Sequence, residues 1–223
     1  MTTDSAPVRR GPGRPPKSNQ SQEQTREALI RAGLAALTEY GFYASGLDGL
    51  LKAAGVPKGS FYHYFANKEA FGLAVLDAYD RYFARKLKRH FDNQHLSPLA
   101  RLEAFVEDAK TGLARFDYRR GCLVGNLGQE IGVLPQTYAL ALEAAFGHWQ
   151  RLLAKCLGEA VTAGELAPQA DCAALAQVFW LGWEGAVMRA RLIKSPAPLD
   201  SFVGFYLAGL PRPAQIPHES LAN

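Results

Sequence analysis

The stretch VPKGSFYHYFANKEAF, residues 56–71, is the part of this sequence from which the fold can be inferred. Three leucines at helical spacing precede it, and Gly55 ends their segment. Pro57 suits the entry to a second short helix, which we expect over residues 58–65. Two short helices joined by a tight turn lay one helix in the major groove of DNA while the other crosses the backbone. The stretch therefore predicts a helix-turn-helix unit.

Helical patterns flank this unit on both sides. Alanine and leucine spacing before a glycine stop predicts a first helix at about 24–40. Ser45 stands at the capping-box spacing from Asp48, at the start of the next helix. Asn67 can cap a fourth helix over about 68–90, which would connect the unit to the rest of the chain.

The remaining chain also reads as helical, without a strand pattern of useful length. A chain of 223 residues exceeds what one small DNA-reading module requires, so we expect a second, larger region with its own core. Its expected helices lie at about 98–117, 121–131, 136–163, 171–193 and 199–209.

The positive charge of the chain is concentrated at its N-terminal end. Residues 1–68 hold nine Lys and Arg against five Asp and Glu, which accounts for the whole formal net charge of +4. The remaining residues are balanced, with sixteen of each sign. A basic face on a small unit fits a polyphosphate partner, whereas the neutral remainder indicates a different function.

The composition also indicates in which cellular compartment the protein is expected. The sequence has neither a signal-like apolar N-terminus nor an uninterrupted apolar run of membrane length. Its three cysteines form no CxxC pair, which fits a reducing compartment. We therefore expect a soluble cytoplasmic protein with no membrane association, no metal site and no cofactor.

Residues 1–24 form a basic arm that is rich in Pro, Gly, Ser and Gln and nearly devoid of apolar side chains. We expect it to be disordered on its own. Gly13-Arg14-Pro15, flanked by basic residues, resembles an AT-hook, whose arginine enters a narrow A·T minor groove. The alternative is a solvated tail that adds only non-specific attraction. The arm residues expected at DNA are Arg9, Arg10 and Arg14.

The string YGFYASGLDGLLKAAG, residues 40–55, together with the stretch that follows it, resembles the DNA-binding domain of the TetR family of bacterial regulators. The resemblance implies an all-α fold of about nine helices and a homodimer that binds double-stranded operator DNA of palindromic sequence. It also implies release of the DNA when a small-molecule inducer binds the larger region. Residues 25–71 would then be the helix-turn-helix DNA-binding domain, 72–210 the ligand-binding and dimerisation domain, and 211–223 a flexible tail.

Several residues of the DNA-binding domain match positions at which this family contacts DNA. Lys58, Gly59 and Ser60 open the second helix, where a cation, backbone N–H groups and a small residue can approach phosphates. The resemblance assigns further backbone and base contacts to Tyr62, His63 and Lys68. For Ser45, a helix cap and a phosphate contact remain open as alternatives.

Other features of the same stretch have a structural explanation. The spacing of Phe61, Tyr64 and Phe65 fits packing against the neighbouring helices, so we expect them in the core. His63 has no second His or Cys at ligand spacing, and a zinc site is therefore not expected there.

The segment RRGCLVGNLGQE, residues 119–130, lacks the glycine spacing of nucleotide-binding loops. With FWLGWEGAVMRARL, residues 179–192, it resembles the regulatory region of a TetR branch that responds to acrylate and other electrophiles. Cys122 occupies the cysteine position of that branch, and we expect it in the inducer site. Arg119, Arg120 and a helix start beside it should lower the pKa of its thiol. Free cysteine is also a common core residue, and acrylate can bind reversibly without bonding to sulfur.

The apolar helix expected over 171–193 suits a position between a pocket and a second subunit. Glu184 has no helical neighbour able to pair with a carboxylate, so a buried position would make it a functional-site candidate. Arg191 can hold an anionic ligand, or it can simply complement the helix dipole. The other candidates for the ligand site are Asn126 and three tryptophans, Trp149, Trp180 and Trp183. For the tryptophans, ordinary core packing is the alternative.

These features favour a ligand-responsive transcriptional repressor whose inducer is acrylate or a related short carboxylate or electrophile. An activator of the same architecture is the near alternative. A DNA-organising protein that relies on the basic arm would show little sequence preference and no ligand response. An enzyme is not expected, because Cys122 has no motif-level base partner and the sequence offers neither a cofactor loop nor a metal cluster.

Overall fold

The computed structural model describes residues 19–213, with side chains from residue 22 onward. Within that range the chain forms nine helices and no strand, which confirms the all-α prediction. None of these helices combines the length and the apolar character needed to cross a membrane. The helices are α1 (Asn19–Ala44), α2 (Leu47–Ala54), α3 (Lys58–Phe61), α4 (Lys68–Phe91), α5 (Pro98–Arg115), α6 (Leu123–Gln129), α7 (Gln136–Thr162), α8 (Cys172–Ile193) and α9 (Ala197–Ala208).

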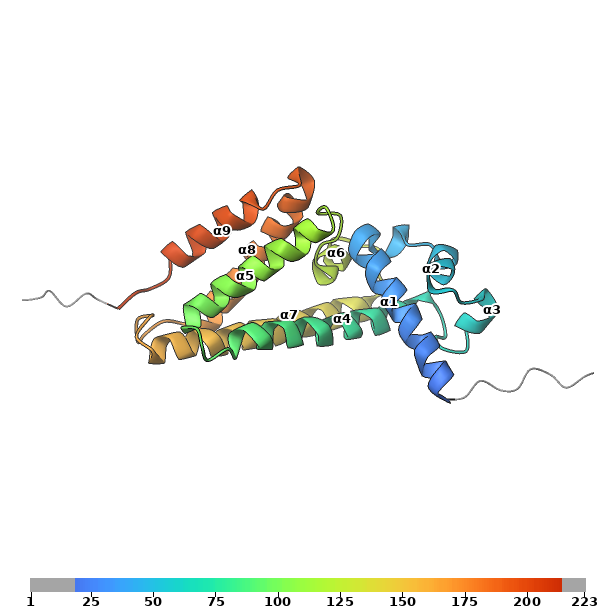
Figure 1. Ribbon diagram of the computed structural model, residues 1–223, viewed down its shortest axis with the longest axis horizontal. Coiled ribbons are helices and arrows are strands. Elements are labelled where there is room, and N and C mark those ends of the chain that lie inside the picture. Colours follow the sequence, from blue (N-terminus) through green and yellow to red (C-terminus); the bar gives the residue numbers. More distant parts are fainter. Residues whose placement is uncertain (1–18, 214–223) are drawn as a thin grey trace, which may run out of the picture.

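The helices form two groups along an elongated molecule (Figure 1). Helices α1, α2 and α3 cluster at one end, and α4 leads away from them beside α7. Helices α5, α8 and α9 lie over the α4–α7 pair, with α8 packed against both α7 and α9. Short α6 contacts α1 as well as α7, so it lies where the two groups meet.

Aromatic rings form the core of the second group. Trp149 of α7 and Trp180 of α8 are fully buried, with ring centroids 5.3 Å apart. The ring of Phe83 on α4 lies 4.5 Å from that of Trp149. The indole Nε1 of Trp149 donates a hydrogen bond to Oδ1 of Asp80 at 2.7 Å, so its burial leaves no unpaired donor. These rings hold α4, α7 and α8 together.

Two helix boundaries near the N-terminus differ from the prediction. Helix α1 begins at Asn19 rather than at about 24, so the end of the expected disordered arm is helical. The Gln and Glu side chains there lose little rotamer freedom in a helix, which explains the extension. Helix α3 ends at Phe61 rather than at 65. Beyond it the N–H of Tyr64 bonds back only three residues, because the chain tightens to bury both Phe61 and Phe65.

The predicted capping box at Ser45 was wrong. Gly46 is the N-cap of α2, and no side chain bonds to the helix start there. Ser45 is buried instead, and its Oγ donates to the carbonyl of Gly41 at 2.6 Å. Gly41 interrupts α1 with a φ of 81°, a left-handed conformation that favours glycine. Asn67 caps α4 as predicted, because its Oδ1 accepts from the N–H of Ala70 at 2.7 Å.

The C-terminal segment is partly attached to the helices. The N–H of Ala167 donates to the carbonyl of Pro211 at 2.8 Å, and Arg212 donates to the carbonyl of Glu165 at 3.2 Å. These two bonds connect Pro211 and Arg212 to the loop before α8. The flexible tail expected over 211–223 stays a prediction, and its residues 214–223 lie outside the described residues.

Candidate nucleic-acid interface and ligand site

The turn after α2 presents polar side chains at the surface. Lys58 and Gly59 are exposed, and Ser60 is half-buried. The Nζ of Lys58 lies 2.9 Å from Oδ1 of Asp48, and this hydrogen bond raises the pKa of the lysine, which therefore stays charged. No atom within 4 Å would meet a Cβ at Gly59, so the backbone there is open to a large partner.

Aromatic residues alternate between core and surface in the same turn. Phe61 and Phe65 are buried, with ring centroids 5.6 Å apart, as the sequence predicted. Tyr64 is half-buried against them. Tyr62 and His63 are exposed, 57% in the case of Tyr62. The buried rings thus fix a short turn whose remaining side chains face outward.

Two of the predicted DNA contacts have partners inside the protein. The Nζ of Lys68 donates to the carbonyl of Phe42 at 2.6 Å and lies 4.4 Å from the centre of the Phe42 ring. Partial burial lowers the pKa of Lys68. The buried hydroxyl of Ser45 bonds to Gly41, as described above. For both residues, contact with phosphate remains a prediction. The arm residues Arg9, Arg10 and Arg14 lie outside the described residues.

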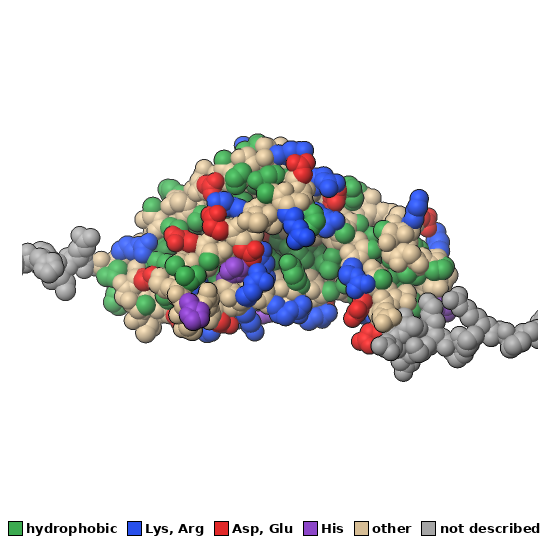
Figure 2. Space-filling model, in the orientation of Figure 1, with side chains coloured by type: hydrophobic (Ala, Val, Ile, Leu, Met, Phe, Trp, Pro, Cys, Tyr) green, Lys and Arg blue, Asp and Glu red, His purple; other side chains and the backbone are tan. Residues whose placement is uncertain are grey.

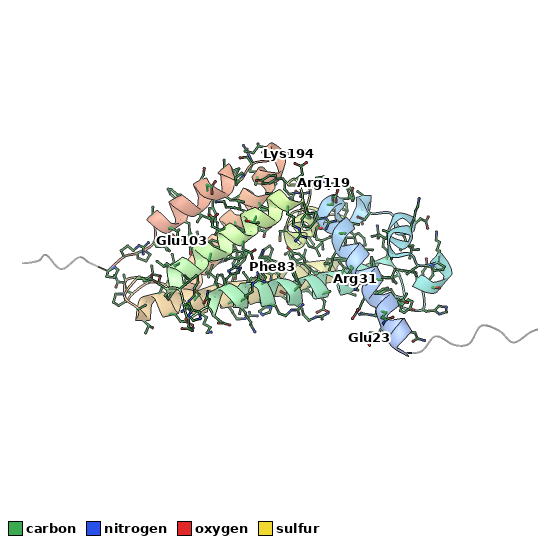
Figure 3. The ribbon with its side chains drawn as sticks, in the orientation of Figure 1. Glu23, Arg31, Phe83, Glu103, Arg119 and Lys194 are labelled. Carbon is green, nitrogen blue, oxygen red and sulfur yellow. The ribbon has the colours of Figure 1, made fainter. Side chains whose placement is uncertain are left out.

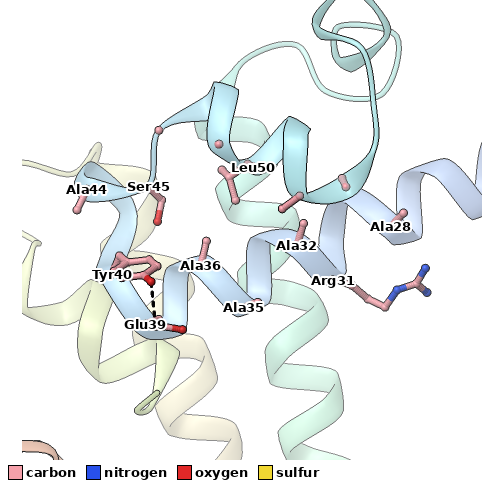
Figure 4. A pocket seen from close by; sticks show the side chains of 14 residues that line it. Ala28, Arg31, Ala32, Ala35, Ala36, Glu39, Tyr40, Ala44, Ser45 and Leu50 are labelled. Atoms are coloured by element: carbon pink, nitrogen blue, oxygen red, sulfur yellow. Dashed lines mark hydrogen bonds between the residues drawn. The ribbon is translucent and has the colours of Figure 1, made fainter. Parts of the chain in front are cut away.

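A pocket of about 690 Å³ lies between α1 and α2 (Figure 4). Alanine and glycine make up most of its lining, and Arg31 points away from the row of alanines. Glu39 accepts a hydrogen bond from the hydroxyl of Tyr40 at 2.9 Å, drawn as the dashed line. Nine of its fourteen lining residues are Ala or Gly, so small side chains explain this hollow.

Four of the predicted ligand residues meet at one pocket of about 260 Å³ between α6 and α8, called the inner pocket below. They are Cys122, Asn126, Glu184 and Arg191. The three tryptophans do not line it: Trp149 and Trp180 belong to the core, and Trp183 lines a neighbouring pocket. The structure therefore brings these four candidates together, and of the four only Cys122 also lines the pocket of Trp183.

Arg191 connects the inner pocket to the end of α1. It donates to Oδ1 of Asn126 at 2.7 Å, and to the carbonyls of Glu39 and Arg119 at 3.2 and 3.0 Å. Asn126 in turn donates to the carbonyl of Thr38 at 2.8 Å. The Nε of Arg191 is buried and has no hydrogen-bond partner among the described residues. A buried donor of this kind is costly unless another group satisfies it.

Glu184 is the second polar group of the inner pocket with an unsatisfied atom. Its Oε1 is buried without a partner in the described part of the chain. Burial raises the pKa of this carboxyl to about 7. A Cβ at Gly125 would collide with Oε2 of Glu184, so the glycine makes room for the carboxyl. Near neutral pH the group is therefore present both with and without its proton.

The environment of Cys122 contradicts the predicted thiolate. The side chain is buried, and burial followed by the nearby charge of Glu184 raises the pKa of its thiol well above the usual value. Arg119 and Arg120 do not offset this, because both pair with Glu39, at 3.2 and 3.6 Å. The prediction of a lowered pKa was wrong, because the thiol is buried and Glu184 of α8 lies beside it, and the local sequence indicates neither the burial nor that contact.

A second pocket of about 390 Å³, called the outer pocket below, shares Cys122 with the inner one. It lies between α1, α4 and α5, where Figure 2 shows apolar side chains in a hollow bordered by Lys and Arg. Figure 3 places Phe83 between α4 and α5, and Arg31 on the neighbouring part of α1. Both residues line the pocket.

Sequence reasoning missed Glu130, at the end of α6. Its carboxylate accepts hydrogen bonds from the backbone N–H of Phe42 at 3.0 Å and of Tyr43 at 3.2 Å. A Cβ at Gly41 would collide with Oε1 of Glu130. Because the partners are backbone groups 88 and 87 residues earlier in the chain, no local pattern in the sequence could indicate the contact.

Comparisons with known proteins agree with this architecture. Residues 29–75 match the family of bacterial regulatory proteins called the tetR family, and residues 98–205 match the tetracyclin repressor-like C-terminal domain. The chain is 51% identical to the transcriptional regulator AcuR of Cereibacter sphaeroides, over 90% of this chain and 91% of that one. It is 30% identical to the repressor NemR of Escherichia coli K12, over 81% and 91% of the two chains.

A solved structure, the regulatory protein TetR from Rhodobacter sphaeroides, is 52% identical and superposes with a TM-score of 0.81, over 83% of this chain and 98% of that one. The resemblance inferred from the sequence is confirmed, both to the family and to the branch that contains AcuR and NemR. The chain belongs to the tetR family of bacterial regulatory proteins, which are DNA-binding regulators rather than enzymes.

Proposed function

We propose that this chain is a transcriptional repressor that binds a palindromic operator as a homodimer and releases it when a small molecule occupies the inner pocket. Residues 25–71 would read the DNA, and residues 72–210 would bind the ligand and form the dimer. The observation that carries the ligand proposal is the pair of unsatisfied atoms, Nε of Arg191 and Oε1 of Glu184, on one pocket wall. A buried polar atom without a partner needs an explanation, and these two belong to residues of one pocket. The third such atom among the described residues, Nε1 of Trp180, lies in the aromatic core.

The exposure of the turn after α2 supports the DNA contacts. Lys58, Gly59, Tyr62 and His63 are exposed while the phenylalanines beside them hold the backbone. A cation, an open backbone and an exposed aromatic hydroxyl are the groups that contact phosphates and base edges. Ser60, Ser45 and Lys68 complete the proposed contacts within the described residues.

Apolar side chains exposed on α8 and α9 support the homodimer. A two-fold interface would bury the same patch from both copies, and large exposed apolar side chains are otherwise unfavourable. The side chains concerned are 51 to 84% exposed in the single chain: Val178, Leu181, Leu192, Ile193 and Phe205.

The operator proposal is tested with gel shifts on DNA flanking the gene. Lys58→Ala and Tyr62→Ala should each weaken binding about tenfold, because each removes a contact worth about 1–3 kcal/mol. Lys194→Ala is the matched control, since it removes an exposed lysine far from the turn. Equal affinity for scrambled DNA at physiological salt would instead favour a DNA-organising protein.

The basic arm is tested separately by deleting residues 1–18. We propose that Arg9, Arg10 and Arg14 contact DNA, Arg14 in the minor groove. Each lost phosphate contact should reduce the slope of log affinity against log salt by about 0.9. An unchanged slope would remove the arm from the interface. An equal loss for A·T-rich and G·C-rich flanks would leave it as an electrostatic tail.

We propose acrylate, or a related short carboxylate, as the inducer, bound reversibly. The ligand carboxylate would accept from Nε of Arg191 and from the protonated carboxyl of Glu184. Its hydrocarbon part would then lie beside Cys122, at the same pocket wall. Because Nη2 of the same guanidinium donates to the carbonyl of Glu39, a ligand that shifts the guanidinium would loosen the end of α1. The raised pKa of the Cys122 thiol supports reversible binding over addition of sulfur to the alkene.

Operator release is the measurement for the inducer, with acrylate and its saturated analogue propionate compared. Reversible binding predicts that both release the operator and that intact-protein mass spectrometry finds no adduct. Arg191→Met should abolish the response, whereas Arg189→Met, at an exposed neighbour, should not. A response to acrylate alone, with a mass adduct that disappears in Cys122→Ser, would establish the covalent mechanism instead. Full response in Arg191→Met would exclude this site.

A further inference from the structure

The second half of α4 concentrates positive charge at the surface. Residues 81–91 include five Lys and Arg and no Asp or Glu. Three of these cations are exposed and lie three or four residues apart, so they form one stripe along the helix, called the α4 ridge below: Arg81, Arg85 and Lys88. At a rise of about 1.5 Å per residue, the ridge is about 10 Å long. In Figure 2, Lys and Arg side chains gather below the hollow, where Figure 1 places α4.

The other two cations of this segment have partners on α5. Lys86 lines the outer pocket and is only 15% exposed. Lys86 and Arg89 both contact a carboxylate oxygen of Asp108, at 3.2 and 2.9 Å. On the ridge, by contrast, neither Arg85 nor Lys88 has an ion-pair partner within the described part of the chain. The ridge therefore presents two exposed cations that the protein itself does not neutralise.

The carboxylates near the ridge are engaged elsewhere. Asp77 pairs with Arg81, one turn before the unpaired cations. Asp92, just after α4, pairs with the Nζ of Lys155 on α7 at 2.9 Å. Asp80 accepts the indole hydrogen bond of the aromatic core described above. An anionic partner at the ridge would therefore not have to displace one of these acids from the two unpaired cations.

The stability of α4 does not explain the ridge. A helix dipole favours cations only in the last turn, whereas Arg81 and Arg85 lie ten and six residues before Phe91, where the helix ends. Arg85 also has an arginine four residues before it and another, Arg89, four residues after it. Like charges at this spacing destabilise a helix slightly. The ridge therefore has a small cost in stability, which favours a role in binding.

The ridge lies too far from the DNA-reading turn to contact the same DNA. Arg81 and Lys88 follow Lys68, the first residue of α4, by 13 and 20 residues. At about 1.5 Å per residue they lie about 20 and 30 Å along the helix from that start. Figure 1 shows α4 leading away from the end of the molecule that holds α2 and α3. A straight duplex held at the turn would therefore not reach the ridge.

We propose that the α4 ridge binds a second stretch of double-stranded DNA, without sequence preference, while the DNA-reading turn holds the first. Arg85 and Lys88 contact its phosphates, and such contacts carry no sequence information. A duplex carries about one charge per 1.7 Å of its axis, so a ridge of about 10 Å faces about six of them. DNA is the polyanion that a regulator of this family meets. The proposal rests on the proposed role of the turn and not on a ligand.

The test is a capture experiment on beads. An immobilised duplex from the DNA flanking the gene is saturated with the full-length protein, and a labelled duplex of random sequence is then added. The wild-type protein should retain the labelled duplex. The double variant Arg85→Ala/Lys88→Ala should retain it at least about tenfold less tightly at about 0.1 M salt. Its slope of log affinity against log salt should be smaller by about 1.8, because each lost phosphate contact contributes about 0.9.

Matched variants separate a local contact from general charge and from folding. Arg115→Ala/Arg189→Ala removes the same charge from exposed positions on α5 and α8 and should capture the labelled duplex as the wild type does. Arg85→Lys keeps the charge and should keep most of the capture. The ridge double variant should bind the immobilised duplex normally, and its melting temperature should not fall, because it removes like-charge neighbours.

Equal capture by the ridge double variant and the wild type would overturn the proposal. Capture that is lost on deletion of residues 1–18 but kept in the ridge variant would assign the second duplex to the basic arm instead. Retention of labelled poly-glutamate, without retention of labelled DNA, would assign the ridge to an acidic protein and overturn the proposal as well.

A separate measurement covers failure of the operator proposal. If the wild-type protein is not retained on the immobilised DNA, the operator proposal fails. The salt dependence of binding to the random duplex in solution then decides about the ridge. Its slope should be smaller by about 1.8 in the ridge double variant and unchanged in the Arg115→Ala/Arg189→Ala control. Equal slopes for the two double variants would overturn the second DNA contact.

Discussion

The DNA-reading turn and the inner pocket hold their polar residues in different ways. The turn exposes Lys58, Tyr62 and His63 on a backbone fixed by buried rings. The inner pocket encloses Cys122, Glu184 and Arg191 among several helices. In the first region a side chain can change without disturbing its neighbours. In the second, each polar group is a partner or a potential partner of another. Substitutions in the turn should therefore change DNA binding and leave stability nearly unchanged. Substitutions in the pocket should change both the stability of the fold and ligand binding.

The largest expected difference compares two aromatic residues. Trp149→Ala should lower the free energy of unfolding by about 4 kcal/mol, because it leaves a cavity in the core and removes the donor of Asp80 Oδ1. Tyr62→Ala should change stability by less than about 0.5 kcal/mol while it weakens operator binding. Urea denaturation of both variants measures the contrast. Similar losses of stability would show that the turn is part of the core after all.

A smaller effect concerns pH. The pKa of Glu184 is raised to about 7, above the value near 4.3 expected in the unfolded chain. Between these values the folded protein holds a proton that the unfolded chain releases, so stability should fall as pH rises and level off above about pH 7. The loss should be at most about 4 kcal/mol, because one pKa unit corresponds to about 1.4 kcal/mol.

Glu184→Gln is the control for this pH dependence. Cys122 and Tyr79, whose pKa values are also raised by burial, stay neutral in the same range. Denaturation at about pH 5 and about pH 8 should therefore give nearly equal stabilities in this variant. A wild-type protein that is equally stable at both pH values would show that the carboxyl is solvated.

The smallest effect tests a single helix cap in the DNA-reading unit. Asn67→Ala should cost about 1 kcal/mol, because the N–H of Ala70 loses its acceptor, and Asn67→Asp should restore most of it. Thermal unfolding measures both variants. Equal melting temperatures for Asn67→Ala and wild type would mean that solvent satisfies this helix start equally well.

The sequence predicts the DNA-reading unit better than the ligand site, for a physical reason. Turn, cap and helix signals in residues 56–71 act between neighbours in the chain, so the unit and the core positions of Phe61 and Phe65 could be predicted. The length of α3 could not, because packing of those same rings ends it early. Helical spacing likewise gave α4 to α9 to within a few residues.

At the ligand site the decisive contacts join distant parts of the chain. The sequence near Cys122 indicated cations that would lower the pKa of its thiol. Burial of the thiol and, after it, the charge of Glu184 raise that pKa instead, while both arginines pair with Glu39. Asn126, Glu184 and Arg191 do line one pocket, and their part in binding a ligand stays a prediction. Aromatic character did not distinguish pocket residues from core residues, because the core and the walls of a pocket both favour aromatic rings.

The meeting of Gly41 with the carboxylate of Glu130 has a consequence for how this protein tolerates change. Any other residue at 41 would have to adopt a positive φ, and its Cβ would collide with the carboxylate. A shorter residue at 130 would leave the N–H groups of Phe42 and Tyr43 without an acceptor. Each substitution is therefore harmful in its own way. Once Glu130 is gone, however, the collision at 41 is gone too, so the double variant should lose less stability than the two single losses added together. In a mutational library the two positions should show positive epistasis, so that a change at one decides which residues the other can accept.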